Sequence, residues 1–119
     1  MRSKDLLLRL RRFDLGEKRQ TVADLEIMIV DFTRMADDLA RQIDLEEQRC
    51  GVRDPSHFAY PTFAKSAQQR RQNLLASIAR LEARLDAARA ELSDALAEMN
   101  KSDPSDRCDA SSGYGLVTA

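Results

Sequence analysis

The sequence predicts an all-α protein, an antiparallel hairpin of two long helices that pack as a coiled coil. One third of its 119 residues are charged, 5% are aromatic and none is Trp, which is typical of long helices rather than sheets. Apolar residues recur at alternating steps of three and four along two long segments, the pattern of a heptad seam. A short stretch with two prolines separates the segments, and short connections favour antiparallel neighbours.

The first helix is predicted over residues 3–49, which contain no Pro and a single Gly, Gly16. Ser3 is suited to cap its start. Gly16 costs about 1 kcal/mol relative to Ala inside a helix, so we expect a soft point or a break there. The predicted seam consists of Leu8, Leu15, Val22, Leu25, Ile29, Phe32, Ala36, Leu39 and Ile43, with Arg11 and Lys18 as polar interruptions.

A connector is predicted over residues 50–61. Gly51 is expected just past the end of the first helix, because Gly adopts left-handed backbone angles without a Cβ clash. The two prolines that follow favour turns over helix. The aromatic residues of this region are expected to fold over the end of the helix pair as a small apolar lid: Phe58, Tyr60 and Phe63.

The second helix is predicted over residues 62–101, because the Asp103-Pro104 step cannot continue a helix. Residues 1–102 would thus form the hairpin, and residues 103–119, rich in Ser, Gly and Asp, a disordered tail. The seam of the second helix contains Ala64, Ala67, Arg71, Leu74, Ile78, Leu81, Leu85, Ala88, Leu92, Ala95 and Met99.

Charge is distributed in four blocks that favour this pairing. Residues 1–19 carry seven basic and three acidic side chains, and residues 20–54 carry four and nine. Residues 55–84 carry five and one, and residues 85–119 carry three and seven. Folding at the connector sets each block beside one of opposite sign, whereas a parallel homodimer in register stacks like charges, so the pattern disfavours the parallel dimer.

No enzyme signature is present. The sequence has no Gly-rich phosphate loop, no paired Cys or His at metal-ligand spacing and no nucleophile motif. His57 is the one histidine and has no partner residues nearby in the sequence, and Cys50 and Cys108 are interpreted as free thiols. We therefore expect no catalysis, no cofactor and no metal.

The longest apolar stretch, residues 25–32, is interrupted by Glu26 and Asp31 and is too short to span a bilayer. No signal-peptide core follows the charged N-terminus. The net charge of −1 gives no overall field toward nucleic acid or an acidic membrane. These features predict a cytoplasmic protein.

Two kinds of surface residue are candidates for binding a partner protein. Basic residues are either a solvated face or a contact for an acidic partner, and apolar residues off the seam are either scattered or a docking site. A nucleic-acid interface is the least favoured, because aromatic residues are not interleaved with the basic ones. The basic candidates are Arg9, Arg11, Arg12, Lys18 and Arg19, followed by Lys65, Arg70 and Arg71; the apolar ones are Ile27 and Val30, with Ala23 beside them.

Four segments resemble the FliJ-type flagellar export proteins of α-proteobacteria. They are MRSKDLLLRLRRF at 1–13, EKRQTVADLE at 17–26, DPSHFAYPTFAK at 54–65 and QRRQNL at 69–74. The likeness covers about residues 1–100, and the connector is its most specific part because it carries no heptad pattern. The family usually continues its second helix with more charged sequence, whereas Asp103-Pro104 stops it here.

The resemblance implies a two-helix protein at the cytoplasmic face of the flagellar base, similar to the rotor stalk of F-type ATPases. Such a protein acts in type III export as an adaptor for the export ATPase, the export gate and export chaperones, and meets the membrane only indirectly through that apparatus. The basic end from Arg9 to Arg19 would face the ATPase. Two alternatives stay open: a structural coiled coil with no export role, such as a homodimer that buries Ile27 and Val30, and a nucleic-acid-associated protein.

Overall fold

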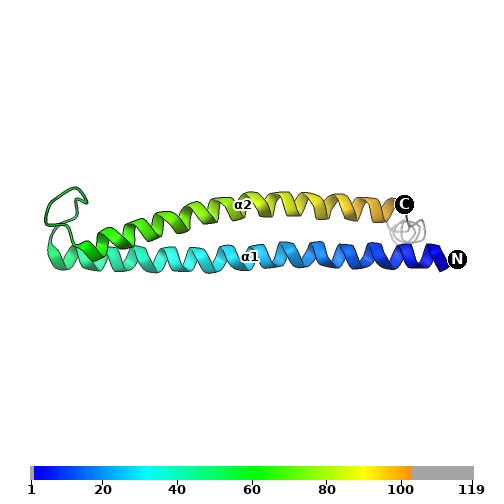
Figure 1. Ribbon diagram of the computed structural model, residues 1–119, viewed down its shortest axis with the longest axis horizontal. Coiled ribbons are helices and arrows are strands. Elements are labelled where there is room, and N and C mark those ends of the chain that lie inside the picture. The colour runs from blue at the N-terminus through cyan, green and yellow to red at the C-terminus, as the bar shows by residue number, and fades with distance from the viewer. Residues whose placement is uncertain (1, 103–119) are drawn as a thin grey trace, which may run out of the picture. The chain divides into compact units, whose positions relative to one another are not determined.

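A computed structural model of the protein describes residues 2–102, which form an all-α antiparallel hairpin (Figure 1). Helix α1 runs over Arg2–Cys50 and helix α2 over Thr62–Ser102. Both predicted helices are confirmed to within one residue at each end. The predicted disordered tail and Cys108 lie outside the described residues. Within the described range, neither helix has a hydrophobic run long enough to cross a lipid bilayer.

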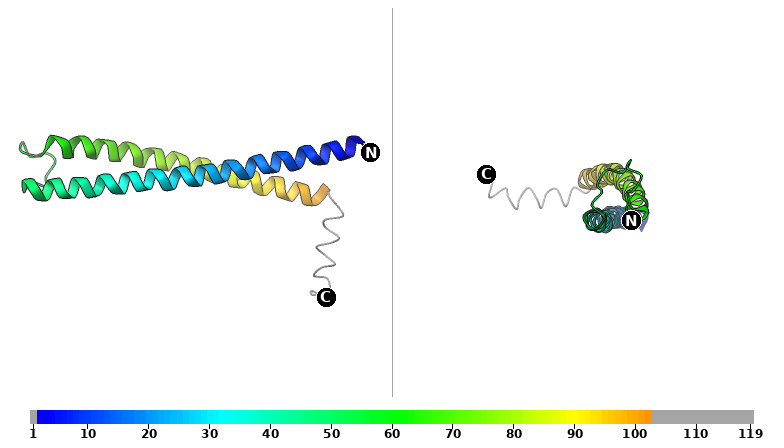
Figure 2. Two further views of the ribbon diagram at one scale, coloured as in Figure 1. Left: turned by 90° about the horizontal axis from the view of Figure 1, so that it is seen from below. Right: turned by 90° about the vertical axis from the view of Figure 1, so that its left-hand side faces the viewer.

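The hairpin consists of two compact units, each built from one segment of α1 and one of α2. The first, here called the turn unit, is Asp24–Leu85 and includes the connector. The second, the terminal unit, combines residues 2–23 of α1 with residues 86–102 of α2. In the turn unit, the α1 segment (cyan) and the α2 segment (green) lie side by side and antiparallel in both side views (Figures 1 and 2).

The predicted seam forms the core. Ten of the eleven buried hydrophobic residues in the described part of the chain are seam residues, and the eleventh is Tyr60. A fully buried Leu or Ile side chain contributes about 1.5–3 kcal/mol, so this stripe is the main source of stability. The buried seam residues are Leu15 in the terminal unit and Leu25, Ala36, Leu39, Ile43, Ala64, Ala67, Ile78, Leu81 and Leu85 in the turn unit.

Next to the connector, the helices pack through small side chains. Ala64 and Ala67 are completely or almost completely buried against Leu39 and Ile43 of α1, and Tyr60 completes this cluster. Val52 and Leu74 cover its margins. Because alanine occupies little space, the two helices can approach closely here, and the larger side chains Leu39 and Ile43 of α1 pack directly against the alanines of α2.

The two glycines of the described chain behave differently. Gly51 has a φ of +76°, and its N–H donates a hydrogen bond of 2.8 Å to the carbonyl of Glu47, so it caps α1 in the left-handed conformation as predicted. Gly16 lies inside α1, and the predicted break there is wrong. The adjacent Leu15 is buried, and packing of the apolar face outweighs the low propensity of one Gly.

The connector is ordered by local hydrogen bonds. Asp54 Oδ1 accepts hydrogen bonds from the N–H and the hydroxyl of Ser56, at 3.0 and 2.8 Å. His57 Nδ1 accepts one from the N–H of Ala59 at 3.0 Å. The carbonyl of Pro61 then accepts the first hydrogen bond of α2, from the N–H of Lys65 at 3.0 Å.

The predicted aromatic lid is confirmed for one residue of three. Tyr60 is buried, but Phe58 is 96% exposed and Phe63 is 49% exposed. The Phe58 ring stacks on His57, with centroids 4.7 Å apart and an interplanar angle of 23°. The turns at Asp54 and His57 direct the chain so that Phe58 faces solvent, and the lid prediction is wrong at Phe58 and Phe63.

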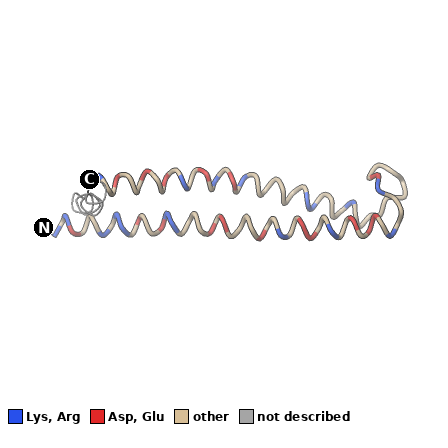
Figure 3. Tube along the Cα trace, turned by 180° about the vertical axis from the view of Figure 1, so that it is seen from behind, with Lys and Arg blue, Asp and Glu red and all other residues tan. Residues whose placement is uncertain are grey.

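The charge pattern follows the predicted pairing within each unit. In the turn unit, the acid-rich part of α1 runs beside a part of α2 in which basic residues prevail (Figure 3). In the terminal unit, Arg11 and Asp14 of α1 line one shallow groove with Glu98 of α2. The basic start of α1 therefore lies beside the acidic end of α2, as expected.

Candidate functional site

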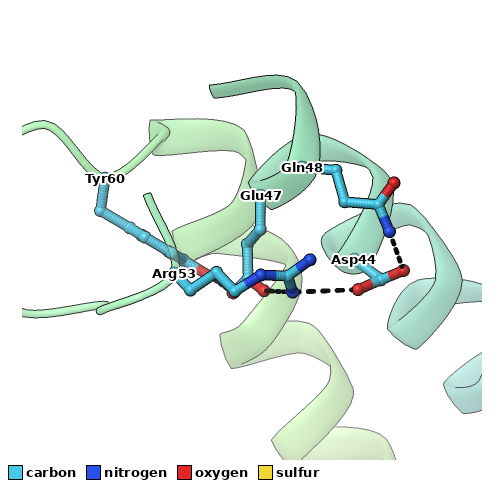
Figure 4. A network of polar contacts seen from close by, with 5 residues as sticks. All are labelled: Asp44, Glu47, Gln48, Arg53 and Tyr60. Atoms are coloured by element: carbon cyan, nitrogen blue, oxygen red, sulfur yellow. Dashed lines mark hydrogen bonds and ion pairs between the residues drawn. The ribbon is translucent and has the colours of Figure 1, made fainter. Parts of the chain in front are cut away.

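A network of polar contacts fixes the connector onto α1 (Figure 4). The Tyr60 hydroxyl donates a hydrogen bond of 2.6 Å to Glu47 Oε2. Arg53 Nη1 lies 3.2 Å from Glu47 Oε1 and 3.1 Å from Asp44 Oδ1, and Gln48 donates to the other oxygen of Asp44 at 2.9 Å. Two carboxylates of α1 thus hold two connector residues, which makes the network a structural clamp.

The titration of these groups agrees with a structural role. Burial raises the pKa of Tyr60, and the hydrogen bond that its hydroxyl donates to Glu47 raises it further. The hydrogen bonds from Ser56 lower the pKa of Asp54, and the hydrogen bond from Arg49 lowers the pKa of Glu46. The pKa shifts of Asp54 and Glu46 follow mainly from hydrogen-bond donors and that of Tyr60 mainly from burial, and each favours the form present at neutral pH.

The described residues offer no arrangement suited to a metal. No group of three or more His, Cys, Asp or Glu side chains among residues 2–102 could hold an ion. Cys50, the cysteine within the described range, is an exposed free thiol.

The first basic cluster is divided between two sides of α1 in the terminal unit. Arg9, Arg12 and Arg19 are exposed, and Arg12 and Arg19 are about 20° apart around the helix at 100° per residue. Arg11 lines the groove with Glu98 on the seam side, and the half-exposed Lys18 pairs with Asp14 at 3.1 Å. Arg12 and Arg19 are thus exposed together on one side of α1.

The second basic cluster is divided as well. Lys65 and Arg70 are exposed on α2, whereas Arg71 is half-buried at its seam position. The Nε atom of Arg71 is buried and has no hydrogen-bond partner, and the side chain lines a shallow groove with Asp44 and Glu47 of α1. Arg71 is therefore a cation within the helix pair and is less accessible to a partner than Arg70.

The apolar candidates of the turn unit lie at the surface, as predicted. Ile27 is 59% exposed and Val30 is 55% exposed, and Ala23, at the end of the adjoining segment, is half-buried. Their use as a docking site stays a prediction.

A second exposed apolar stripe was not among the sequence candidates. Leu6, Leu10 and Phe13 lie at spacings of four and three residues on the outer face of α1 in the terminal unit, and are 56%, 55% and 67% exposed. The signal was available, because 100° per residue places all three far from the Leu8 and Leu15 seam. The run of three leucines at 6–8, with Leu10 just beyond Arg9, concealed the two separate faces.

Comparison of the chain with models of protein families, with curated proteins and with solved structures found no match. The fold and its surfaces define a class of protein: a two-helix hairpin with exposed basic and apolar helix faces.

Proposed function

We propose that this chain is a flagellar type III export component of the FliJ type, a stalk-like adaptor without catalysis of its own. It engages the export ATPase, contacts the export gate and export chaperones, and acts in the cytoplasm at the flagellar base. The observation that carries the proposal is the connector. Residues 54–65, which bear the most specific resemblance, are ordered by their own hydrogen bonds and close an antiparallel hairpin.

The helices support the same role. A stalk-like adaptor needs a helix pair with a continuous seam, and the turn unit buries nine seam residues between its two segments. Contact with an acidic partner needs exposed cations, and Arg9, Arg12 and Arg19 are exposed on α1. Long-range attraction between such groups is screened by salt, so binding is expected to weaken as ionic strength rises.

Binding of the purified chain to the purified export ATPase tests the proposal by calorimetry at low and high salt. The variant Arg12→Glu/Arg19→Glu is expected to bind at least about tenfold more weakly, since each reversal replaces an attraction by a repulsion of about 1 kcal/mol or more. Arg80→Glu/Arg84→Glu makes the same charge change at exposed positions of α2 and should bind like the parent chain.

Absence of binding at low salt refutes the export role. If both double variants bind the ATPase equally weakly, the overall charge of the chain drives association rather than the pair Arg12 and Arg19. The alternative of a structural coiled coil with no export role is favoured by the exposure of Ile27 and Val30, and it predicts self-association without any affinity for the ATPase.

A further inference from the structure

In the terminal unit, one face of α1 alternates cations and large apolar side chains. Arg2, Leu6, Arg9 and Phe13 fall within about 40–60° around the helix at 100° per residue, and all four are exposed. No acidic side chain pairs with either arginine in the described structure. We call these four residues the basic face.

In the turn unit, one face of α1 has the opposite charge and a similar apolar centre. Asp24, Ile27 and Asp31 fall within about 60° around the helix, and all are exposed. Ile27 thus lies beside two carboxylates, both of which also have contacts within their own chain; that of Asp31 is with Arg34 at the surface, at 3.4 Å. We call these three residues the acidic face.

We propose that the basic face of one copy docks on the acidic face of a second copy, with the two α1 helices antiparallel. One register sets Leu6 opposite Ile27, Arg9 opposite Asp24 and Arg2 opposite Asp31. Each apolar side chain then meets an apolar one, and each guanidinium meets a carboxylate. Because both faces lie on the same helix, a two-fold pair makes this contact twice, as isologous dimers do.

Charge decides the orientation and the occupant. A parallel pair in register places Arg2 and Arg9 against their own copies, and like charges in contact are destabilising. An anionic lipid surface would suit the basic face, but it would leave Ile27 uncovered between two carboxylates. A second copy covers both faces, so the observations favour it.

Gly16 gives independent support. Gly16 lies between the two faces in the sequence of α1, and no atom from outside its own stretch of helix backbone lies within 4 Å of the place where a side chain would begin. An exposed Gly inside a helix is less favourable than Ala, and no described neighbour of Gly16 requires it. The lack of a side chain at Gly16 would allow a second helix to approach α1 closely, which accounts for a Gly at this position.

Directed disulfide formation tests the register. In a chain with Cys50 and Cys108 replaced by Ser, the variant Leu6→Cys/Ile27→Cys places two thiols 21 residues apart on one helix. The continuous helix between them excludes a bond within one chain, because disulfides join Cα atoms only about 4.4–6.8 Å apart. Mild oxidation should give a covalent dimer in most of the protein.

Each single cysteine variant, and the pair Leu6→Cys/Leu45→Cys at the exposed Leu45, should stay largely monomeric under the same conditions. Equal cross-linking of the 6–27 and 6–45 pairs overturns the register. Exclusive 6–6 or 27–27 bonds overturn the antiparallel orientation.

Charge exchange tests the contact in solution. By analytical ultracentrifugation at low salt, the parent chain should dimerise, and Arg9→Asp or Asp24→Arg should each weaken the dimer about tenfold, since each removes two surface ion pairs. The combined Arg9→Asp/Asp24→Arg variant should regain most of that affinity, with circular dichroism confirming intact helices.

Leu45→Ser is the control that should leave the dimer unchanged, while Leu6→Ser should weaken it. A chain that is monomeric at low salt and high concentration overturns the proposal, as does a monomer that sediments with anionic phospholipid vesicles through Arg9. No ATPase enters these measurements, so their outcome is independent of the export role.

Discussion

Removal of one hydroxyl should loosen the connector clamp by a measurable amount. Tyr60→Phe deletes the 2.6 Å hydrogen bond to Glu47 and keeps the buried ring. Hydrogen bonds to charged groups contribute about 1.5–3 kcal/mol. Glu47 retains Arg53 at 3.2 Å, so the carboxylate is not left unpaired, and we expect a loss near the lower limit, about 1.5 kcal/mol in the free energy of unfolding.

Urea denaturation followed by helical circular dichroism measures this loss, and pH gives it a second signature. The folded-state pKa of Tyr60 is raised above its ordinary value of 10.0. The bond's contribution is therefore fully present below pH 10 and is lost as the pH rises through the raised pKa. Tyr60→Phe should lack this alkaline decrease in stability.

The reasoning is refuted if Tyr60→Phe unfolds at the parent's urea midpoint, or if its stability falls in alkali as steeply as the parent's. A double-mutant cycle with Glu47→Gln would then show whether the two side chains are coupled at all.

Three further changes test other parts of the hairpin. Gly51→Ala should destabilise the fold by about 1 kcal/mol because its φ is +76°, whereas Gly16→Ala should stabilise α1 by up to the same amount; thermal melts at low protein concentration compare the two, and the reverse order would contradict the assigned conformations. Arg71→Leu should raise the free energy of unfolding by about 1–2 kcal/mol and the urea midpoint with it, because it replaces a desolvated guanidinium by a side chain suited to the seam; a lower midpoint would indicate that Asp44 and Glu47 need this cation. Asp54→Asn should make the free energy of unfolding fall less steeply as the pH is lowered into the acid range. The pKa of Asp54 lies below its ordinary value of 3.8, so its contribution is present above that pH and is lost as the pH falls through the lowered pKa; an unchanged acid limb would contradict the role of Ser56.

Much of the fold could be predicted from the sequence because a coiled coil is specified by its period. The three-four alternation alone identified Leu25, Leu39, Ile78 and Leu81 as core residues, and all four are buried. Gly51 and the prolines located the connector for a similar reason, since their backbone limits act locally.

The connector's interior was less predictable. The sequence does not show whether the ring of Phe58 or that of Tyr60 is buried. The burial of one ring depends on the hydrogen bonds that Asp54 and His57 accept within the connector. It also depends on the hydrogen bond between Tyr60 and Glu47, which are 13 residues apart in the sequence. These contacts are set by three-dimensional geometry, which the hydrophobic period does not encode.

The surface candidates were predicted in part. Ile27 and Val30 were recognised because they lie off a regular seam, and their exposure follows from helix geometry alone. Leu6 and Phe13 were missed because hydrophobic residues of the seam and of the outer face lie next to one another in this part of the sequence. The position of Arg71 was predicted by its heptad place, but the burial of its Nε depends on how the side chains of the two helices pack in three dimensions.

The alanine packing beside the connector has a kinetic consequence. Ile43 and Ala64 belong to the same cluster, and only about twenty residues of chain separate them. The loop that must close before they make contact is therefore short, and its entropic cost is low. Chains rich in such near-neighbour contacts reach the native state quickly. We therefore expect folding to begin at the connector and helix pairing to spread from there toward the ends of the helices. Destabilising substitutions near Tyr60 should slow refolding, whereas those near Leu85 should mainly speed unfolding.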